Sequence, residues 1–288
     1  MLSYIHAFHA GNHADIIKHL TFSMVLKHLL KKDKPFTVID THSASGIYDL
    51  SDERLLKTGE AKSGIQKLFE NTEFKKLKEI DSSGYFSIAE EYLKKGLYPG
   101  SPEIARCFMR VNDSLILNEF HPQVIKELKS NMKHPLIIQK SDIPAVSIHQ
   151  RNASEMAKAV IPPVVKRGCV IIDPSYEDEN DFTETTDLFL TAYKKWNTGT
   201  YLIWYPLLSH RESQIDRMKE LITLTVEQQN AGNEDEKTLI LELKVKEPEQ
   251  MTGLAKLYGS GMIIVNPPYG LKEKAEEILP LLHKLLAE

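Results

Sequence analysis

Residues 168–176, GCVIIDPSY, contain the clearest strand of the chain, because five small or apolar residues run without interruption into Asp-Pro-Ser-Tyr. A continuous apolar run predicts a strand that is buried on both faces, as in parallel sheets. Six other short β-rich runs occur along the chain, at residues 36–43 (FTVIDTHS), 114–120 (SLILNEF), 147–150 (SIHQ), 200–207, 238–245 and 261–266.

Helical patterns alternate with these runs, at residues 122–132, 154–160, 183–196, 214–221 and 271–287. The alternation predicts a mostly parallel sheet covered by helices on both faces. The last two strands have only a loop between them, which predicts an antiparallel hairpin at the sheet edge. Seven strands ending in such a hairpin fit the architecture of S-adenosylmethionine (AdoMet) methyltransferases better than a six-stranded dinucleotide-binding fold.

The gap between the first strand and the strand at 114–120 is too long for a simple crossover, since a whole βαβ unit takes about 30 residues. We therefore expect an inserted helical subdomain, with helices near 61–69, 74–79 and 86–95.

Composition places the chain among ordinary globular proteins. Of 288 residues, 42% are hydrophobic and 26% are charged, and the formal net charge of −4 does not indicate a nucleic-acid partner. No apolar run approaches the roughly 18–20 residues of a membrane span, and the first residues do not resemble a secretory signal. The two cysteines, Cys107 and Cys169, are too few for a disulfide framework. We expect a cytoplasmic protein without membrane association.

The first 34 residues differ from the rest in charge. They carry three more positive than negative charges, whereas the remainder carries a net charge of −7. A basic helix here could follow a phosphate backbone, but a solvated amphipathic helix is an equally good interpretation. Further candidates for phosphate contact are Lys166, Arg167, Lys194 and Lys195.

Four histidines in the same segment, His6, His9, His13 and His19, raise the question of a metal site. No cysteine lies among them, and structural zinc sites favour tighter, cysteine-rich spacing. We therefore expect no metal. The histidines would instead form hydrogen bonds to a ligand or phosphate, or pack at the helix entrance.

Two strand ends carry candidate ligand-binding residues. Residues 40–46, DTHSASG, follow the first strand, and ligands of open parallel sheets bind beyond the carboxyl ends of the strands. Glu119 closes the second strand, where an acidic residue typically accepts hydrogen bonds from ribose hydroxyls. Each also has a plain structural interpretation, as a tight turn and as an ordinary surface carboxylate.

The strongest chemical signal is Asp173-Pro174-Ser175-Tyr176, which resembles the Asp/Asn/Ser-Pro-Pro-aromatic motif of amino-methyltransferases. An exocyclic amine is a poor nucleophile because its lone pair is delocalised into the ring. The Asp173 side chain and the Pro174 carbonyl could each accept one N–H, which localises the lone pair, while Tyr176 stacks on the extruded base for about 1–3 kcal/mol. Ser175 breaks the motif, and an ordinary turn after a strand would also explain the stretch.

A second stretch, residues 266–269 (NPPY), matches that motif more closely. Only 19 residues follow it, too few for the later strands that would have to come after a catalytic loop. We interpret it as a rigid exit from the last strand.

Several blocks of the sequence occur together in one order: MLSYIHAFHAGNHADIIKH at 1–19, DTH at 40–42, YPGSPEIAR at 98–106, EFHP at 119–122, DPSYE at 173–177 and WYP at 204–206. Together they resemble the bacterial 23S ribosomal RNA methyltransferases that modify the N6 amine of an adenine. The resemblance spans nearly the whole chain, and the N-terminal block is its most distinctive part.

This resemblance implies an α/β fold of the Rossmann-like, class I AdoMet-dependent methyltransferase type. It has a seven-stranded, mostly parallel sheet and a small helical insertion after the first strand. Residues 1–46 and 114–288 would form the methyltransferase domain, with an N-terminal arm and helix at 1–34. Residues 47–113 would form the inserted subdomain and its return segment.

The resemblance also implies site residues, carried over by matching motif. The catalytic group would be Asp173, Pro174 and Tyr176. AdoMet would contact His19, His42, Ser101, Glu119, Asn152, Ala153 and Asp173, with Asn152-Ala153 standing where the family has Asp-Gly. The substrate RNA would face Tyr4, His6 and Lys18.

The implied activity is transfer of a methyl group from AdoMet to the N6 amine of a specific adenine in 23S rRNA, with no obligate protein partner. Three departures from the family pattern, Ser43, Asn152 and Ser175, keep a second hypothesis open: an RNA-binding protein of the same fold with a degenerate cofactor site. Methylation of DNA adenine or of a protein amide, and a histidine-based metalloenzyme, are also compatible with the sequence.

Overall fold

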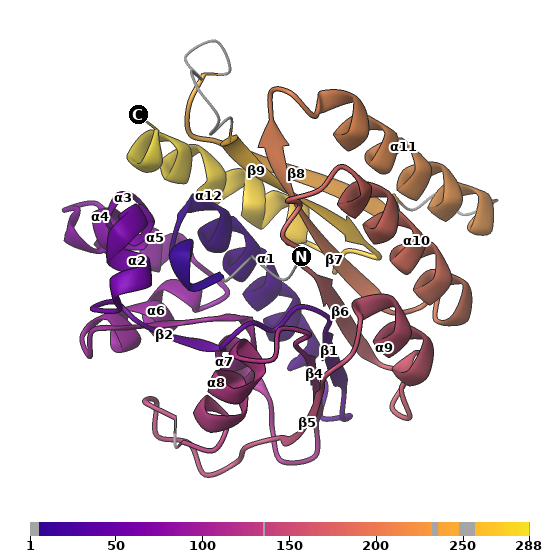
Figure 1. Cartoon of the computed structure of the whole chain (residues 1–288), viewed down its shortest axis with the longest axis horizontal. Coiled ribbons are helices and arrows are strands. Elements are labelled where there is room, and N and C mark those ends of the chain that lie inside the picture. The colour runs from indigo at the N-terminus through magenta and orange to yellow at the C-terminus, as the bar shows by residue number, and fades with distance from the viewer. Residues whose placement is uncertain (1–5, 135, 232–235, 248–256, 288) are drawn as a thin grey trace.

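A central sheet of seven strands organises the molecule, as the sequence predicts. The structure is a computed structural model, described here for all residues except 1–5, 135, 232–235, 248–256 and 288 (Figure 1). The strands of this sheet lie in the order β5-β4-β1-β6-β7-β9-β8. Their bounds are Thr37–Asp40 (β1), Ser114–Asn118 (β4), Ala145–His149 (β5), Gly168–Ile172 (β6), Thr200–Leu208 (β7), Thr238–Lys244 (β8) and Leu257–Val265 (β9).

The sheet changes direction at one strand. β1 pairs in parallel with both β4 and β6, so that Asp40 lies opposite Leu117 and Ile171. β9 runs antiparallel to both of its neighbours, β7 and β8. The predicted antiparallel pairing of the last two strands is confirmed. β9 lies between β7 and β8, which leaves β8 at the edge.

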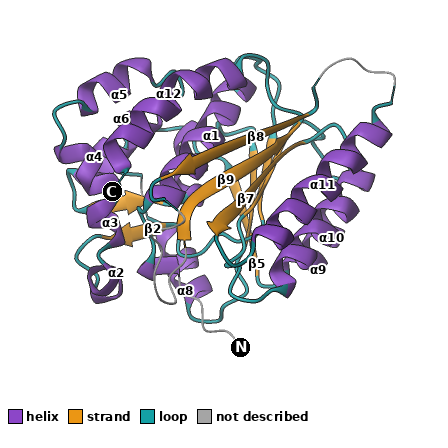
Figure 2. Ribbon diagram, turned by 90° about the horizontal axis from the view of Figure 1, so that it is seen from above, coloured by secondary structure: helices purple, strands orange, loops and turns teal. Residues whose placement is uncertain are grey.

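Helices cover both faces of the sheet, which is why its strands read as continuous apolar runs. Figure 2 shows α9, α10 and α11 on one face, and α1 and α12 with the helices of the insertion on the other. These helices span Ala153–Val160 (α9), Asn180–Lys195 (α10), Glu212–Gln229 (α11), His13–Leu29 (α1) and Leu271–Leu286 (α12). α11 extends eight residues past its predicted end because Ile222 and Val226 continue its buried stripe.

Helix α1 corrects one of the two interpretations of the basic N-terminal segment. It is not a solvated amphipathic helix, because every residue from Ala14 to Leu26 is buried. Lys27 and the lysines after the helix are exposed, and their contact with a phosphate backbone stays a prediction. It packs against β9 and against α7 (Ser101–Phe108). The helix is buried all round although it carries Asp15, Lys18 and His19, and its last turn and the lysines that follow reach the surface.

The insertion contains more structure than the three predicted helices. Two short strands, β2 (Ile47–Asp49) and β3 (Leu97–Pro99), pair antiparallel at its two ends. Between them lie α2 (Glu53–Thr58), α3 (Glu60–Ser63), α4 (Ile65–Glu70), α5 (Phe74–Ile80) and α6 (Tyr85–Leu93). Buried side chains of these helices, such as Leu68 and Phe86, belong to the same apolar core as α1.

Gly64 explains why the helix predicted at 61–69 is split into α3 and α4. Its backbone lies so close to the N-terminal block that a Cβ atom there would be 2.2 Å from the Gly11 carbonyl oxygen. The next residue, Ile65, donates its N–H to that same oxygen at 2.8 Å. Helix α8 (Val124–Asn131) agrees with its prediction, whereas α2 and α7 were not predicted.

Among the described residues, no helix is long and apolar enough to cross a membrane. Both cysteines are free thiols, as expected.

Candidate active site

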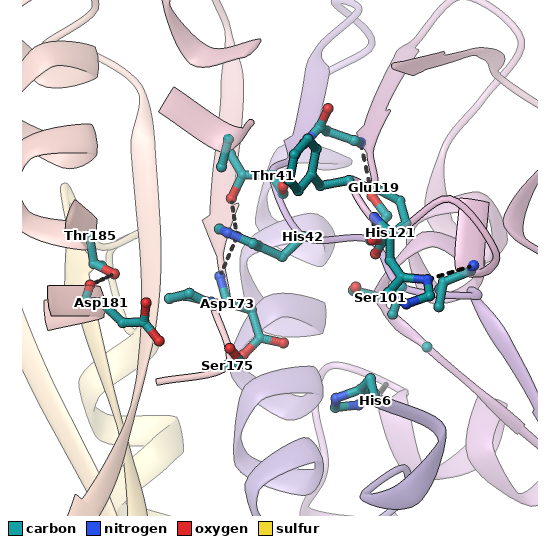
Figure 3. Close-up of a pocket in the computed structure, with 18 of the residues that line it drawn as sticks. His6, Thr41, His42, Ser101, Glu119, His121, Asp173, Ser175, Asp181 and Thr185 are labelled. Carbon is teal, nitrogen blue, oxygen red and sulfur yellow. Dashed lines mark hydrogen bonds between the residues drawn. The ribbon is translucent and has the colours of Figure 1, made fainter. Parts of the chain in front are cut away.

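A cavity opens beyond the carboxyl ends of β1, β4 and β6 (Figure 3), where ligands of open α/β sheets bind. Its volume is about 240 Å³. Three segments supply a large part of its wall, at residues 41–44 after β1, 118–121 at the end of β4 and 173–175 after β6.

The structure brings ten of the predicted site residues to this cavity, although they come from distant parts of the sequence. These residues are His6, Lys18, His19, His42, Ser101, Glu119, Asn152, Ala153, Asp173 and Pro174. Two predicted residues are not among them. Tyr4 lies outside the described residues, and Tyr176 is buried behind the loop that follows β6.

Lys18 is the electrostatic centre of the site. Its Nζ lies 2.7 Å from Oδ1 of Asp15 and 2.5 Å from Oδ2 of Asp173, and the whole residue is only 3% exposed. Burial alone would lower the pKa of this ammonium group, but the two carboxylates raise it well above its usual value. Lys18 therefore stays charged and fixes one oxygen of Asp173.

Asp15 was not predicted as a site residue, yet it joins the N-terminal block to Lys18. Its Oδ2 accepts the N–H of Gly11 at 2.8 Å and contacts Nε2 of His6 at 3.2 Å. Burial opposes ionisation, but Lys18 and the histidines hold the pKa of Asp15 well below its usual range. The only sequence signal was the position of Asp15 one helical turn before Lys18.

The N-terminal histidines have protein partners. His9 contacts Glu60 at 2.8 Å, and Nδ1 of His19 lies 2.8 Å from the Tyr98 hydroxyl. Burial lowers the pKa of His19 to about 3, so this imidazole is neutral. These contacts match packing at the helix entrance, one of the roles expected for the histidines.

Asp40 at the end of β1 supports the cavity from behind. Its Oδ2 accepts the hydroxyl of Ser101 at 2.7 Å, and its Oδ1 accepts the N–H of His42 at 3.1 Å. Burial raises the pKa of Asp40 to about 7, although both hydrogen bonds act against that rise. Asp40 thus positions two of the residues expected to bind AdoMet.

His42 connects the β1 loop to the loop that carries Asp173. Its Nδ1 lies 2.8 Å from the Thr41 hydroxyl and accepts the backbone N–H of Asp173 at 3.4 Å (Figure 3). Burial lowers the pKa of His42 to about 4, so the ring is neutral near pH 7. A neutral ring can hold the start of the Asp173 loop without adding positive charge to the cavity.

Ser43, one of the departures from the family pattern, has a structural use. Its hydroxyl donates to the Asp40 carbonyl at 3.2 Å and accepts the N–H of Asn118 at 3.1 Å. The extra hydroxyl therefore joins the β1 loop to the end of β4, and the chain continues through Ala44 in a left-handed conformation with φ of 48°.

Two hydrogen-bond acceptors in the cavity wall, Glu119 and Asn152, each already accept one backbone N–H. Glu119 accepts the N–H of His121 at 2.6 Å, and burial raises its pKa. Asn152 is the N-cap of α9, and its side-chain oxygen accepts the N–H of Ser154 at 2.9 Å. The amide oxygen that was expected to face a ligand thus already serves its own helix.

Tyr176 differs from its predicted position. Its hydroxyl donates to the Trp204 carbonyl at 2.8 Å, and its ring centre lies 4.5 Å from that of Phe182. The residue is left-handed, with φ of 51°, which turns the side chain into the core behind the loop. In this conformation the ring cannot stack on a base in the cavity.

Three residues of the cavity wall, Phe120, Asp181 and Thr185, were not predicted from the sequence. Phe120, half exposed beside Glu119, offers the cavity an apolar face. Asp181 and Thr185 of α10 also line the cavity, on the side where Asp173 lies (Figure 3). The adjacent Glu119 was a signal for Phe120, but nothing in the sequence distinguished Asp181 from other helix acids.

Two features define the class of the protein. Antiparallel β9 lies next to the edge strand β8, and the acidic residues Glu119 and Asp173 line the cavity just after the ends of β4 and β6. The fold is that of a Rossmann-like class I methyltransferase, the AdoMet-dependent class.

Comparison with known proteins identifies the family within this class. The family model described as "Ribosomal RNA large subunit methyltransferase D, RlmJ" matches residues 33–288. Two proteins named ribosomal RNA large subunit methyltransferase J are similar over 99% of this chain and 94% of their own length. That of Escherichia coli K12 is 35% identical and that of Haemophilus influenzae is 36% identical. The chain belongs to this family of large-subunit ribosomal RNA methyltransferases.

A solved structure has the same fold over nearly the whole chain. A crystal structure of a Legionella pneumophila protein superposes with a TM-score of 0.78 at 30% identity. The match covers 96% of this chain and 94% of that one.

Proposed function

We propose that this chain transfers the methyl group of AdoMet to the exocyclic N6 amine of an adenine in 23S rRNA. The family supports a large-subunit ribosomal RNA as the substrate. The choice of amine rests on one observation: Asp173 lies in the cavity at the end of β6, with its carboxylate held by Lys18.

The chemistry of the lining fits AdoMet, which carries a sulfonium cation. Carboxylates of Glu119, Asp173 and Asp181 face the cavity, while Lys18 is already paired with Asp15 and Asp173. The residues proposed to hold AdoMet are His19, His42, Ser101, Glu119, Asn152, Ala153 and Asp173. When bound, AdoMet supplies an electrophilic methyl group.

The protein's own residues act on the amine. Asp173 accepts one N–H and the Pro174 carbonyl accepts the other, so the nitrogen lone pair is localised and free to attack. Lys18 holds the Asp173 carboxylate in one orientation. Stacking by Tyr176 requires residues 175–177 to leave the conformation in which the Tyr176 hydroxyl is bound to Trp204.

Contacts to the RNA are proposed for Tyr4 and His6. Lys18 was expected to face RNA, but its pairing with two carboxylates favours an action through Asp173.

We further propose that the enzyme works in the cytoplasm without an obligate protein partner, and that residues 47–113 form a subdomain inserted into the methyltransferase domain. A degenerate RNA-binding protein is not favoured, because the Ser43 hydroxyl is used by the backbone.

The test is transfer of labelled methyl from AdoMet to deproteinised, unmodified 23S rRNA. Wild type should form N6-methyladenine, and Asp173→Ala should lower the rate by at least about 100-fold while AdoMet still binds. Asp187→Ala, an exposed aspartate on α10, is the matched control and should keep the wild-type rate. Unchanged turnover in Asp173→Ala would contradict the proposed role, and a product other than N6-methyladenine would contradict the proposed amine.

A further inference from the structure

The NPPY stretch that competed with the catalytic motif lies at the opposite edge of the sheet and presents an exposed aromatic ring. Tyr269 is 95% exposed, although its loop is firmly anchored. The Asn266 side chain donates to the carbonyl oxygens of Asn197 and Gly199, both at 2.8 Å. These bonds confirm a rigid exit from β9, so the ring of Tyr269 projects from a fixed base.

Tyr269 separates two basic hollows. On one side the wall contains Lys27, Lys31 and Lys274, from helices α1 and α12 and the turn after α1. On the other side it contains Lys166 and Arg167. The two hollows share Tyr269 and neighbouring residues, so the aromatic ring stands between two groups of cations.

The lysines around Tyr269 carry charge that is not offset by an ion pair. Among the residues that the structure describes, no carboxylate forms an ion pair with Lys27, Lys31, Lys166 or Lys274. The clustering also affects His28 between them, whose pKa is lowered by burial and then by nearby cations such as Lys31, Arg167 and Lys274. Paired charges add little to recognition, whereas unpaired lysines can bind an external anion.

Arg167 is held in place by the protein itself. Its guanidinium donates to the carbonyl oxygens of Leu29 and Lys34 and lies 5.7 Å from the ring centre of Phe36. The hollow beside Lys166 is therefore preformed.

This region is distant from the methyl-transfer cavity. It borders Gly168 and Thr200, the first residues of β6 and β7, whereas the cavity lies beyond the last residues of the parallel strands. Because β6 has five residues, the two edges are about 16 Å apart along that strand alone. A base bound in the cavity cannot also contact Tyr269.

We infer that the surface formed by Lys27, Lys31, Lys166, Arg167, Tyr269 and Lys274, the Tyr269 surface, binds a second, unpaired segment of the substrate RNA. An aromatic ring between cations is the arrangement that recognises single-stranded nucleic acid, since a base stacks on the ring and phosphates lie against the cations. The inference rests on the proposed function for the identity of the RNA. It adds a contact that would raise affinity for long rRNA without taking part in the chemistry.

The experiment compares three variants of the full-length protein with the wild type. Tyr269→Ala removes the ring, and the triple variant Lys27→Gln/Lys31→Gln/Lys274→Gln removes three charges. The matched control, Lys62→Gln/Lys75→Gln/Lys129→Gln, removes three exposed lysines far along the chain from this surface. Binding of deproteinised, unmodified 23S rRNA is measured between about 50 and 200 mM KCl, together with KM and kcat for methyl transfer.

We expect Tyr269→Ala to weaken binding at least about fivefold, the equivalent of roughly 1 kcal/mol of lost stacking. The triple variant should reduce the slope of log K against log salt by about 2, since each phosphate contact of a single strand contributes about 0.7. KM should rise and kcat at saturating RNA should stay at the wild-type value, and the control should change neither affinity nor slope.

The outcomes separate this inference from the proposed function. Wild-type affinity, slope and KM in both variants would overturn the Tyr269 surface, even where methyl transfer proceeds. An equal change of slope in the control would also overturn it, because the effect would then be one of net charge. If wild type binds 23S rRNA but transfers no methyl, the proposed function fails, while weaker binding confined to the two variants still supports the surface.

Discussion

Replacement of Lys18 by methionine tests the charge arrangement at the centre of the site. The Nζ of Lys18 lies within 2.7 Å of a carboxylate oxygen of Asp15 and 2.5 Å of one of Asp173, so those two oxygens are no more than about 5.2 Å apart. Without the cation they repel each other by about 3 kcal/mol at an effective dielectric constant of about 20. We therefore expect Lys18→Met to lower the free energy of unfolding by about 3 kcal/mol near pH 7.5, within the usual range for a broken buried pair.

The stability lost in Lys18→Met should depend on pH, and the pKa of Asp15 determines the direction of that dependence. In the wild type the pKa of Asp15 is depressed, so its stabilising contribution is present above the unfolded pKa and is lost only as the pH falls through the folded pKa. In Lys18→Met, burial and repulsion act without the cation and raise the pKa of one of the two carboxylates. The deficit should therefore shrink as the pH falls toward 5 and that carboxylate binds a proton.

Urea unfolding at pH 7.5 and 5.5 measures both effects. The matched control is Lys219→Met, because Lys219 also contacts a carboxylate, Glu242 at 2.6 Å, but is 21% exposed. That surface pair should contribute less than about 1 kcal/mol. Equal losses in the two variants, or a deficit in Lys18→Met that does not change with pH, would refute the reasoning.

Three further predictions concern residues around the site. Asp40→Asn keeps an acceptor for the His42 N–H and places an amide N–H₂, which can donate to the Ser101 hydroxyl oxygen, at the other position. The change removes a carboxyl whose pKa burial raises to about 7, and the stability from such a group is lost as the pH rises through the folded pKa. Urea unfolding should therefore favour the variant by about 2 kcal/mol more at pH 8.5 than at 5.5, and parallel pH profiles would contradict this. Gly64→Ala should lower the free energy of unfolding, measured in urea, by at least about 1–3 kcal/mol, because the new Cβ would clash with the Gly11 carbonyl oxygen. Ser63→Ala, the control, should leave that free energy nearly unchanged. Tyr176→Phe should lose about 1 kcal/mol of stability with its bond to Trp204 but keep kcat, because the ring remains; a large loss of kcat would assign the hydroxyl a role in the reaction.

The sheet was predictable because local sequence carries its pattern. Continuous apolar runs ending in Asp40, Glu119 and Asp173 indicated both the strands and the edge at which their polar ends meet. Helix α7 was not predicted, because its start, Gly100-Ser101-Pro102, has the composition of a turn. Pro102 is tolerated only because it falls in the first helical turn.

Features that depend on distant contacts could not be predicted. Lys18 and Asp173 are 155 positions apart, so a lysine that reads as a solvated charge becomes a buried ion pair only in the folded chain. Tyr176 fits a stacking motif in sequence, but the carbonyl of Trp204 on β7 provides a competing partner that draws it inward. The break at Gly64 likewise reflects its contact with Gly11 and not its own helical propensity.

The packing of α1 against β9 affects when the parts of the site come together as the protein is synthesised and folds. α1 ends at Leu29 and β9 begins at Leu257, so α1 is synthesised well before the strand against which it packs. The surface of α1 that packs on β9 therefore stays uncovered until β9 has been made, and its burial depends on contacts of very high sequence separation, which form slowly. Since Lys18 lies on α1 and is held by Asp173, we expect the methyl-transfer site to reach its final geometry only after β9 has joined the sheet.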